Sequence, residues 1–100
     1  MTDTRPILEA IALKKCLRAT YNRVEMKLAP HILYTRDEDL HMDAIALEKN
    51  GAPPKEKKLG VFRLSGLSEM KVLDESFVPQ SLFQPEAERY AGKALMMVEV

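Results

Sequence analysis

The chain has 100 residues, the length of one ordinary domain, and its 46% apolar content with only four glycines and six prolines is typical of a globular protein. Fifteen basic residues balance fifteen acidic ones, which excludes an overall electrostatic attraction to nucleic acid or to an anionic membrane, so any polyanion site must be a local patch. No apolar stretch is long enough for a membrane span, no signal peptide is visible and Cys16 has no disulfide partner within the chain; we therefore expect a cytoplasmic protein.

The first element is predicted to be a helix over residues 5–16. Asp3 or Thr4 can cap it, and Pro6 falls in its first turn, where a missing N–H costs nothing. Apolar residues at helical spacing form one stripe that ends at Cys16, so this thiol is expected to be buried on the helix.

Five strands are predicted to follow the helix. Residues 17–21 and 24–28 alternate apolar and polar side chains around an Asn22-Arg23 turn, which indicates a hairpin. Pro30 predicts a bulge before the alternation resumes at Ile32. The remaining predictions are an acidic turn at 37–39, a strand over 40–47 covered on both faces, a polar surface loop over 48–58, and strands over 59–64 and 67–73. Five short strands after a helix suggest a small barrel.

The last 27 residues carry weaker signals. Phe77, Val78, Leu82 and Phe83 are expected to anchor the segment, and residues 86–97 are predicted to be partly helical, although Gly92 weakens a helix there. The apolar end of the chain could instead form a closing strand or a surface that awaits a partner. The predicted organisation is a domain over residues 1–79 and a C-terminal extension over residues 80–100.

The order of these elements resembles the WYL-domain family over roughly residues 5–79. The resemblance is carried by the leading helix, Tyr21, a strand that ends in Leu-Ala-Pro, the Phe-Arg-Leu around Arg63 and the Leu-Asp-Glu-Ser-Phe that ends at Phe77. It implies a mainly β (α+β) fold with a five-stranded Sm-like, SH3-type barrel, and a regulatory role in sensing a ligand, including nucleotides or single-stranded nucleic acid. His41 lies in the segment that corresponds to the family's Trp-Tyr-Leu, and the family's second arginine falls on Gly66.

Four residues are candidates for a ligand site. Arg63 lies in an apolar strand, where its guanidinium could clamp a phosphate or carboxylate or could simply face solvent. His41 and Asp43 share a strand face, so His41 could stack on a base or form a pH-sensitive hydrogen bond, or it could be a half-buried strand histidine. Tyr21 either packs its ring in the core or contributes its hydroxyl to the site.

We expect neither catalysis nor a cofactor or metal. No serine or cysteine has a persuasive histidine partner, glycine-rich phosphate loops are missing from the sequence, and His31 and His41 lack a third ligand at a familiar spacing. Three hypotheses remain open, the weakest of which is a DNA-modulating accessory factor, because the neutral net charge is poor support for it. The first is a ligand-sensing regulatory module for a small anion or single-stranded nucleic acid, linked to transcriptional control; the second is an interaction module that has lost the site and forms a homodimer or joins a separate regulatory protein.

Overall fold

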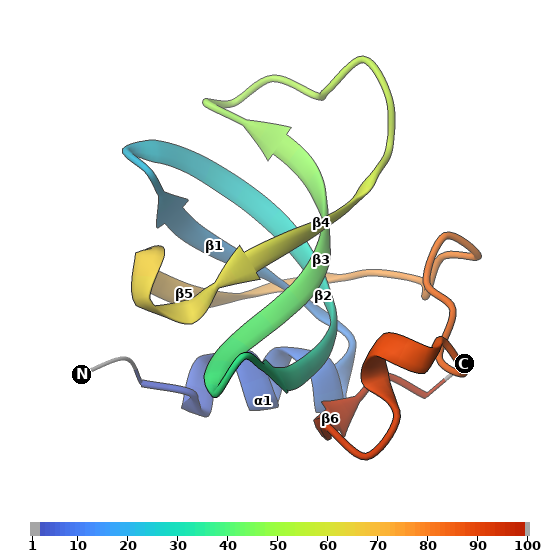
Figure 1. The fold of residues 1–100 in the computed structure, drawn as a ribbon. Coiled ribbons are helices and arrows are strands. Elements are labelled where there is room, and N and C mark those ends of the chain that lie inside the picture. The colour runs from blue at the N-terminus through green and yellow to red at the C-terminus, as the bar shows by residue number, and fades with distance from the viewer. Residues whose placement is uncertain (1–2, 100) are drawn as a thin grey trace.

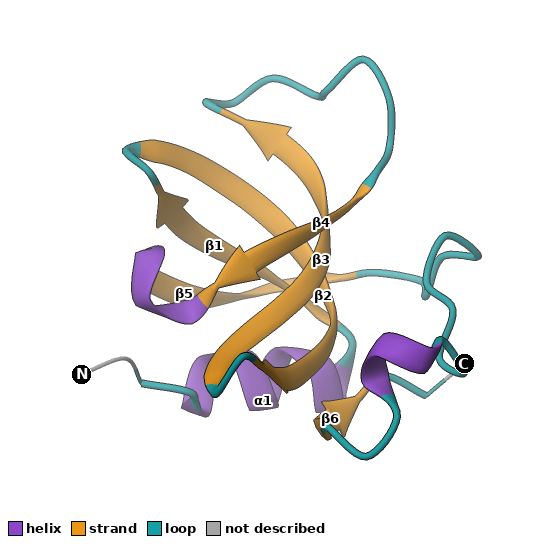
Figure 2. Cartoon of the chain, viewed as in Figure 1, coloured by secondary structure: helices purple, strands orange, loops and turns teal. Residues whose placement is uncertain are grey.

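The computed structural model describes residues 3–99, so the outermost residues of the two predicted ranges, 1–2 and 100, lie outside it. The elements in chain order are α1 (Arg5–Leu13), β1 (Lys15–Tyr21), β2 (Val24–Arg36), β3 (Asp39–Lys49), β4 (Leu59–Arg63), the 3-10 turn η1 (Leu64–Gly66), β5 (Leu67–Ser76), the 3-10 turn η2 (Glu88–Tyr90) and β6 (Ala94–Met97). The prediction of a mainly β chain with one leading helix is confirmed (Figure 2). Its helix is not long and apolar enough to cross a membrane.

The strands form one antiparallel sheet in the order β4-β3-β2-β1-β5, with β6 added beside β2. The long strand β2 pairs with β1 through its first part, Val24 to Leu28, and with β6 through Ile32 to Tyr34. The hydrogen-bonded order of the described strands is therefore that of an open, six-stranded sheet, with one strand more than predicted. Figure 1 shows the sheet curling, with α1 and β6 at one end and the loop over residues 50–58 at the other.

The helix ends earlier than the sequence pattern predicts. Lys14 adopts a left-handed conformation with φ 56°, and its N–H reaches the carbonyls of Ala10 and Ile11 as a C-cap. The chain then turns directly into β1, so the prediction that Cys16 lies on the helix is wrong. The thiol is fully buried in β1 instead, and burial raises its pKa.

Local turn chemistry accounts for the two hairpins. Asn22 and Arg23 have φ of 50° and 67°, which suits the two-residue turn whose twist matches antiparallel strands. Asp37 and Glu38 repeat this conformation between β2 and β3, with φ of 51° and 68°. The ladder shifts register between Pro30 and Ile32, so the predicted bulge is confirmed.

The core lies between the curved sheet and α1. Because β3 is buried from His41 to Ile45, the prediction that this strand is covered on both faces is confirmed for its central part. The largest fully buried apolar side chains of the core come from the helix, the first three strands and η1: Ile7, Ile11, Leu17, Leu28, Ile32, Leu33, Tyr34, Met42, Ile45 and Leu64.

The helix predicted over residues 86–97 is absent from the described chain. This segment forms only one 3-10 turn, then reverses at Gly92, whose φ of 69° is left-handed, and continues as β6 against β2. Phe77 and Phe83 are buried anchors as expected, but Val78 is 73% exposed and Leu82 46%. The alternative of a closing strand is thus the one observed.

His31 fastens the C-terminal segment to β2. Its ring is fully buried and packs near Phe77 and Phe83. The N–H of Gln80 can only donate, so Nε2 of His31 accepts it at 3.1 Å, and Nδ1 carries the proton that is donated to the carbonyl of Ala29 at 2.7 Å. Burial lowers the pKa of this imidazole, which fits its neutral state.

Candidate anion-binding site

The structure brings three of the four predicted site residues onto one face of the sheet. His41 of β3 is directly opposite Arg63 of β4, and Asp43 lies two residues from His41 on the same face. Arg63 donates to the Asp39 carboxylate at 3.0 Å, and both side chains are more than half exposed. His41 is 9% exposed, so its ring has little surface to offer a ligand.

Tyr21 lies on the other face. Its ring packs edge-on against Phe62, with centroids 5.1 Å apart, and its hydroxyl accepts the backbone N–H of Arg63 at 3.4 Å. A Cβ placed on Gly66 would lie 2.8 Å from this ring, so the missing side chain at that position is what admits Tyr21. The tyrosine therefore acts in packing, against Phe62 and over Gly66.

Asp43 is the centre of a buried polar cluster. Its carboxylate is fully buried and accepts hydrogen bonds from the hydroxyls of Tyr34, at 2.7 Å, and of Tyr90. Arg89 forms an ion pair with the same carboxylate at 3.2 Å. A buried charge is tolerated only when it is paired and hydrogen-bonded, and these three partners from β2 and the C-terminal segment meet that need.

The two tyrosines remain protonated donors. Burial, reinforced by the hydrogen bond to Asp43, raises the pKa of Tyr34 well above its usual range and that of Tyr90 to about 12. Their rings pack edge to face with centroids 5.1 Å apart. Arg89 covers the Tyr90 ring at 4.8 Å and also donates to its hydroxyl, which raises the pKa of the guanidinium. The cluster therefore fixes one cation at the surface.

A pocket of about 320 Å³ lies beside this cluster. The side chains that line it come from the end of β2, the following turn, β4 and the C-terminal segment: Tyr34, Arg36, Asp37, Val61, Arg89 and Lys93. The backbone supports this convergence, because the carbonyl of Lys93 accepts the N–H of Thr35 at 3.1 Å. Three of the lining residues are cationic and one is acidic.

Two of these three cations have no carboxylate partner among the described residues. Within residues 3–99, Arg36 and Lys93 form no ion pair, whereas Arg89 is shared with Asp43. A pocket with free cationic side chains can bind an anion through charge-assisted hydrogen bonds. Sequence reasoning identified Asp43 but missed Arg36, Arg89 and Lys93.

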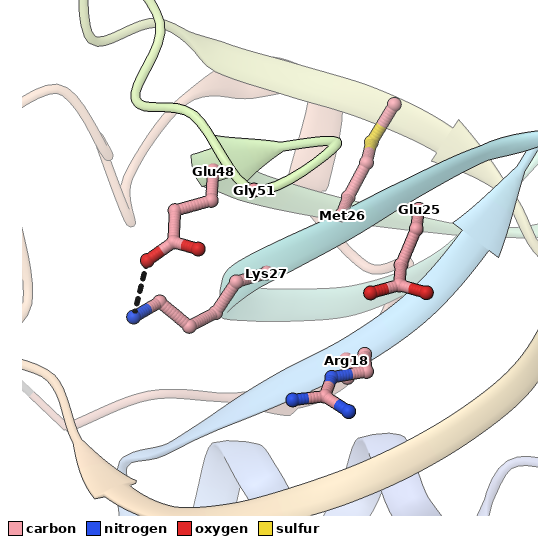
Figure 3. A pocket seen from close by; sticks show the side chains of 6 residues that line it. All are labelled: Arg18, Glu25, Met26, Lys27, Glu48 and Gly51. Atoms are coloured by element: carbon pink, nitrogen blue, oxygen red, sulfur yellow. Dashed lines mark ion pairs between the residues drawn. The ribbon is translucent and has the colours of Figure 1, made fainter.

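A second, smaller pocket of about 60 Å³ has a different charge arrangement. Figure 3 shows Arg18, Glu25, Lys27 and Glu48 around it, and Lys27 is paired with Glu48 at 2.9 Å. Lys27 also contacts Glu75 of β5 at 3.0 Å. Since two carboxylates already neutralise this lysine, the smaller pocket is a poor anion site.

The geometry thus defines a small, mainly β domain with a cation-lined pocket over a buried carboxylate. In the described part of the chain, no group of three or more His, Cys, Asp or Glu side chains could hold a metal ion. Comparisons with protein-family models, curated proteins and solved structures find no match to this chain. The argument for function therefore depends on the residues and their arrangement.

Proposed function

We propose that this chain is a non-catalytic, ligand-sensing module whose pocket at Arg36, Arg89 and Lys93 binds a small anion. The observation that carries the proposal is the convergence of these three cations, from segments more than 50 residues apart, on one pocket with a single acidic neighbour. Their guanidinium and ammonium groups match a phosphate, a phosphate ester or a carboxylate.

The aromatic side chains beside this pocket favour a small anion over single-stranded nucleic acid. Proteins that bind single strands stack bases on accessible rings. Tyr34 is only 1% exposed and Tyr90 only 2%, because both rings are packed around Asp43. They can line the pocket and hold Arg89, but they offer no platform for a base.

Binding would be coupled to the position of the C-terminal segment. Arg36 belongs to β2 and Lys93 belongs to that segment, so without a ligand these two unpaired like charges oppose its docking, whereas Arg89 is compensated by Asp43. An anion between them removes this repulsion and joins the segment to the sheet. Ligand occupancy is thereby converted into a change at the surface of the segment, which a partner can read.

The regulatory part of the proposal is supported by the sequence resemblance to WYL domains. We propose that the curved sheet is a variant of their Sm-like barrel. The two ends of the sheet, β4 and β5, are linked through the 3-10 turn η1, and Tyr21 of β1 contacts Phe62 and the N–H of Arg63 across the gap. A ligand-responsive module of this kind would act on transcription through a separate protein.

Titration of the purified chain with pyrophosphate, followed by calorimetry and by amide NMR shifts, tests the site. Arg36→Ala and Lys93→Ala should each weaken pyrophosphate binding about tenfold, which corresponds to about 1.4 kcal/mol per lost contact. Arg18→Ala, which removes a cation from the smaller pocket, is the matched control and should leave the affinity unchanged. Equal losses in all three variants would mean that only general charge matters and would contradict the proposal.

Arg63→Ala separates this pocket from the site that the family resemblance implies. If pyrophosphate binding is lost in Arg63→Ala and kept in Lys93→Ala, the ligand binds at the exposed Arg63–Asp39 pair instead. Saturable binding of an oligothymidylate of about ten nucleotides, with no binding of pyrophosphate, would favour the nucleic-acid hypothesis.

A second candidate is a protein-interaction or oligomerisation module. The specific observation is that Val78, Leu82 and Leu95 of the C-terminal segment are 73%, 46% and 58% exposed. Exposed apolar side chains of this kind can contribute to an interface. Sedimentation equilibrium with and without pyrophosphate distinguishes the two: a ligand-independent dimer that Leu95→Glu dissociates supports this second function.

A further inference from the structure

Asp37 lines the anion pocket, yet the binding of an inorganic anion does not explain its presence there. A carboxylate repels a phosphate, so a pocket for an inorganic anion alone would bind it more tightly without this acid. The pocket nevertheless combines Asp37 with the cations of Arg36, Arg89 and Lys93. A ligand that suits all four side chains carries an anionic group and, in addition, a group that a carboxylate can hold.

The carboxylate of Asp37 is available to such a group. Within residues 3–99 it forms neither an ion pair nor a hydrogen bond, although it shares the pocket with three cations. Its neighbour Asp39, by contrast, is paired with Arg63 at 3.0 Å. Asp37 and Glu38 form the tight turn between β2 and β3, with φ of 51° and 68°, and aspartate is one of the residues that adopt this left-handed conformation most readily. The turn therefore presents an unpaired carboxylate to the pocket.

Val61 provides accessible apolar surface in the same pocket. It lies directly opposite Asp43 in the β3–β4 ladder, so the two side chains share a face of the sheet. Val61 is 41% exposed, which leaves surface that a ligand can cover. The pocket volume of about 320 Å³ is at the lower end of the range of small-molecule sites, so there is room for a small organic group besides the anion.

We propose that the ligand of this pocket is a hydroxylated phosphate ester such as a sugar phosphate. This inference rests on the function proposed above and names the ligand class of that same site. The phosphate would bind to Arg36, Arg89 and Lys93, a hydroxyl would donate to Asp37, and a C–H face of the sugar would cover Val61. A carboxylate only accepts hydrogen bonds, so the group that it meets must be a donor. A hydroxyl suits the pocket better than an ammonium group, because three cations around one acid repel a positive charge.

A hexose phosphate, glucose 6-phosphate, and cyclohexylmethyl phosphate are suitable probes, because both carry a phosphate ester on a six-membered ring and only the first has hydroxyls. Calorimetry on the full chain should show the hexose phosphate binding about tenfold more tightly, since a hydrogen bond to a charged acceptor is gained. Phosphoethanolamine, which offers an ammonium group instead of hydroxyls, should bind more weakly than the hexose phosphate. Equal affinities of the two ring compounds, or tightest binding of phosphoethanolamine, would overturn the proposal.

Asp37→Asn tests which residue reads the hydroxyls. Asparagine tolerates the left-handed conformation, so the turn is kept while the charge is lost. The preference for the hexose phosphate over cyclohexylmethyl phosphate should fall from about tenfold to about twofold. Because this preference is a ratio for two ligands of equal charge, the repulsion between Asp37 and the phosphate cancels from it. Glu38→Gln removes the same charge from the adjacent turn position, which does not line the pocket, and should keep the preference. An equal fall in both variants would contradict a specific role of Asp37.

Pyrophosphate separates this inference from the function on which it rests. If pyrophosphate and cyclohexylmethyl phosphate bind and the hexose phosphate binds no more tightly, the anion site stands and the ligand class is wrong. If none of these phosphates binds, the site and the ligand class are both wrong. Arg36→Ala should weaken the hexose phosphate about tenfold, as it does pyrophosphate. Unchanged affinity for the hexose phosphate in Arg36→Ala would mean that the sugar phosphate binds elsewhere, against the proposal.

Discussion

Two charged pockets on this sheet differ in where their carboxylates lie. In the small pocket of Figure 3, Glu48 lies at the surface beside Lys27 and pairs with it at 2.9 Å. In the larger pocket, the main compensating carboxylate is that of Asp43, which is fully buried and reaches only Arg89. The buried carboxylate of Asp43 therefore neutralises Arg89 and leaves Arg36 and Lys93 without an ion-pair partner among residues 3–99.

This difference shows how a chain with no net charge can still present a pocket lined by unpaired cations. Fifteen acidic residues are enough to neutralise all fifteen basic ones, but only if they lie beside them. An acid in the interior cannot pair with most of the surface cations. The carboxylate of Asp43 accepts hydrogen bonds from Tyr34 and Tyr90 instead. Local geometry, and not net charge, decides which cations can meet a ligand.

Removal of the buried carboxylate should have the largest effect. Asp43→Ala leaves two buried tyrosine hydroxyls without an acceptor and breaks the contact with Arg89, so we expect the free energy of unfolding to fall by about 3 kcal/mol. Urea denaturation measures this free energy of unfolding. Asp39→Ala breaks an ion pair that is more than half exposed and should cost less than about 1 kcal/mol. Similar losses of unfolding free energy in the two variants would contradict the interpretation that Asp43 is the centre of a buried polar cluster.

Loss of one hydroxyl from the cluster should have a smaller effect. Tyr90→Phe keeps the ring against Tyr34 and removes one hydrogen bond to a charged acceptor, so the free energy of unfolding should fall by about 1.5–2 kcal/mol. Urea denaturation again provides the measurement. The matched control is Tyr21→Phe, whose hydroxyl makes only a 3.4 Å bond to a backbone N–H and whose removal should cost about 0.5 kcal/mol. A reversed order of the two losses would show that Asp43 is not the centre of the cluster.

The contrast between these two tyrosines also shows what the sequence could and could not predict. The first five strands, the hairpin turn at Asn22-Arg23 and the bulge at Pro30 follow from local signals: alternation, turn residues and a missing N–H. Tyr21 was placed on an apolar strand face for the same reason. Each of these features is determined by residues that are close to one another in the sequence.

The anion pocket depends on contacts that no local pattern encodes. β6 is a strand because β2, about 60 residues earlier, offers a free edge next to Ile32, and this pairing overrides the helical tendency of residues 86–97. The same pairing brings Lys93 close to Arg36. Asp43 could be selected from its polar character in an apolar strand, but its partners Arg89 and Tyr90 could not be identified without the course of the C-terminal segment.

Lowering the pH should weaken the attachment of that segment. The pKa of His31 is lowered from 6.5 by burial, so below pH 6.5 the unfolded chain takes up a proton that the folded chain resists, and the stability contributed by the neutral imidazole is lost as the pH falls. No charged side chain contributes to this shift: burial lowers the pKa, and the hydrogen bond to the Ala29 carbonyl offsets part of that lowering. Unfolding measured in urea between pH 8 and pH 5 should show the decline.

The His31→Asn variant provides the reference for this pH series. It removes the imidazole, so whatever pH dependence it keeps belongs to other groups. The wild-type chain should lose more stability than this variant between pH 6.5 and pH 5, and the loosened segment should appear as NMR shifts at Gln80, which donates to His31. Parallel pH profiles would show that His31 does not control the attachment.

The smallest effect is expected at the small pocket. Lys27→Met removes the ion pairs to Glu48 and Glu75, and because both carboxylates are exposed, the free energy of unfolding should fall by less than about 1 kcal/mol, with the difference shrinking at high salt. Pyrophosphate affinity, measured by calorimetry, should be unchanged, because a lysine held between two carboxylates has no charge to spare for an anion. If Lys27→Met weakens pyrophosphate as much as Lys93→Ala does, then neutralisation by surface carboxylates does not distinguish the two pockets, and the buried position of Asp43 is not what makes the larger one a site.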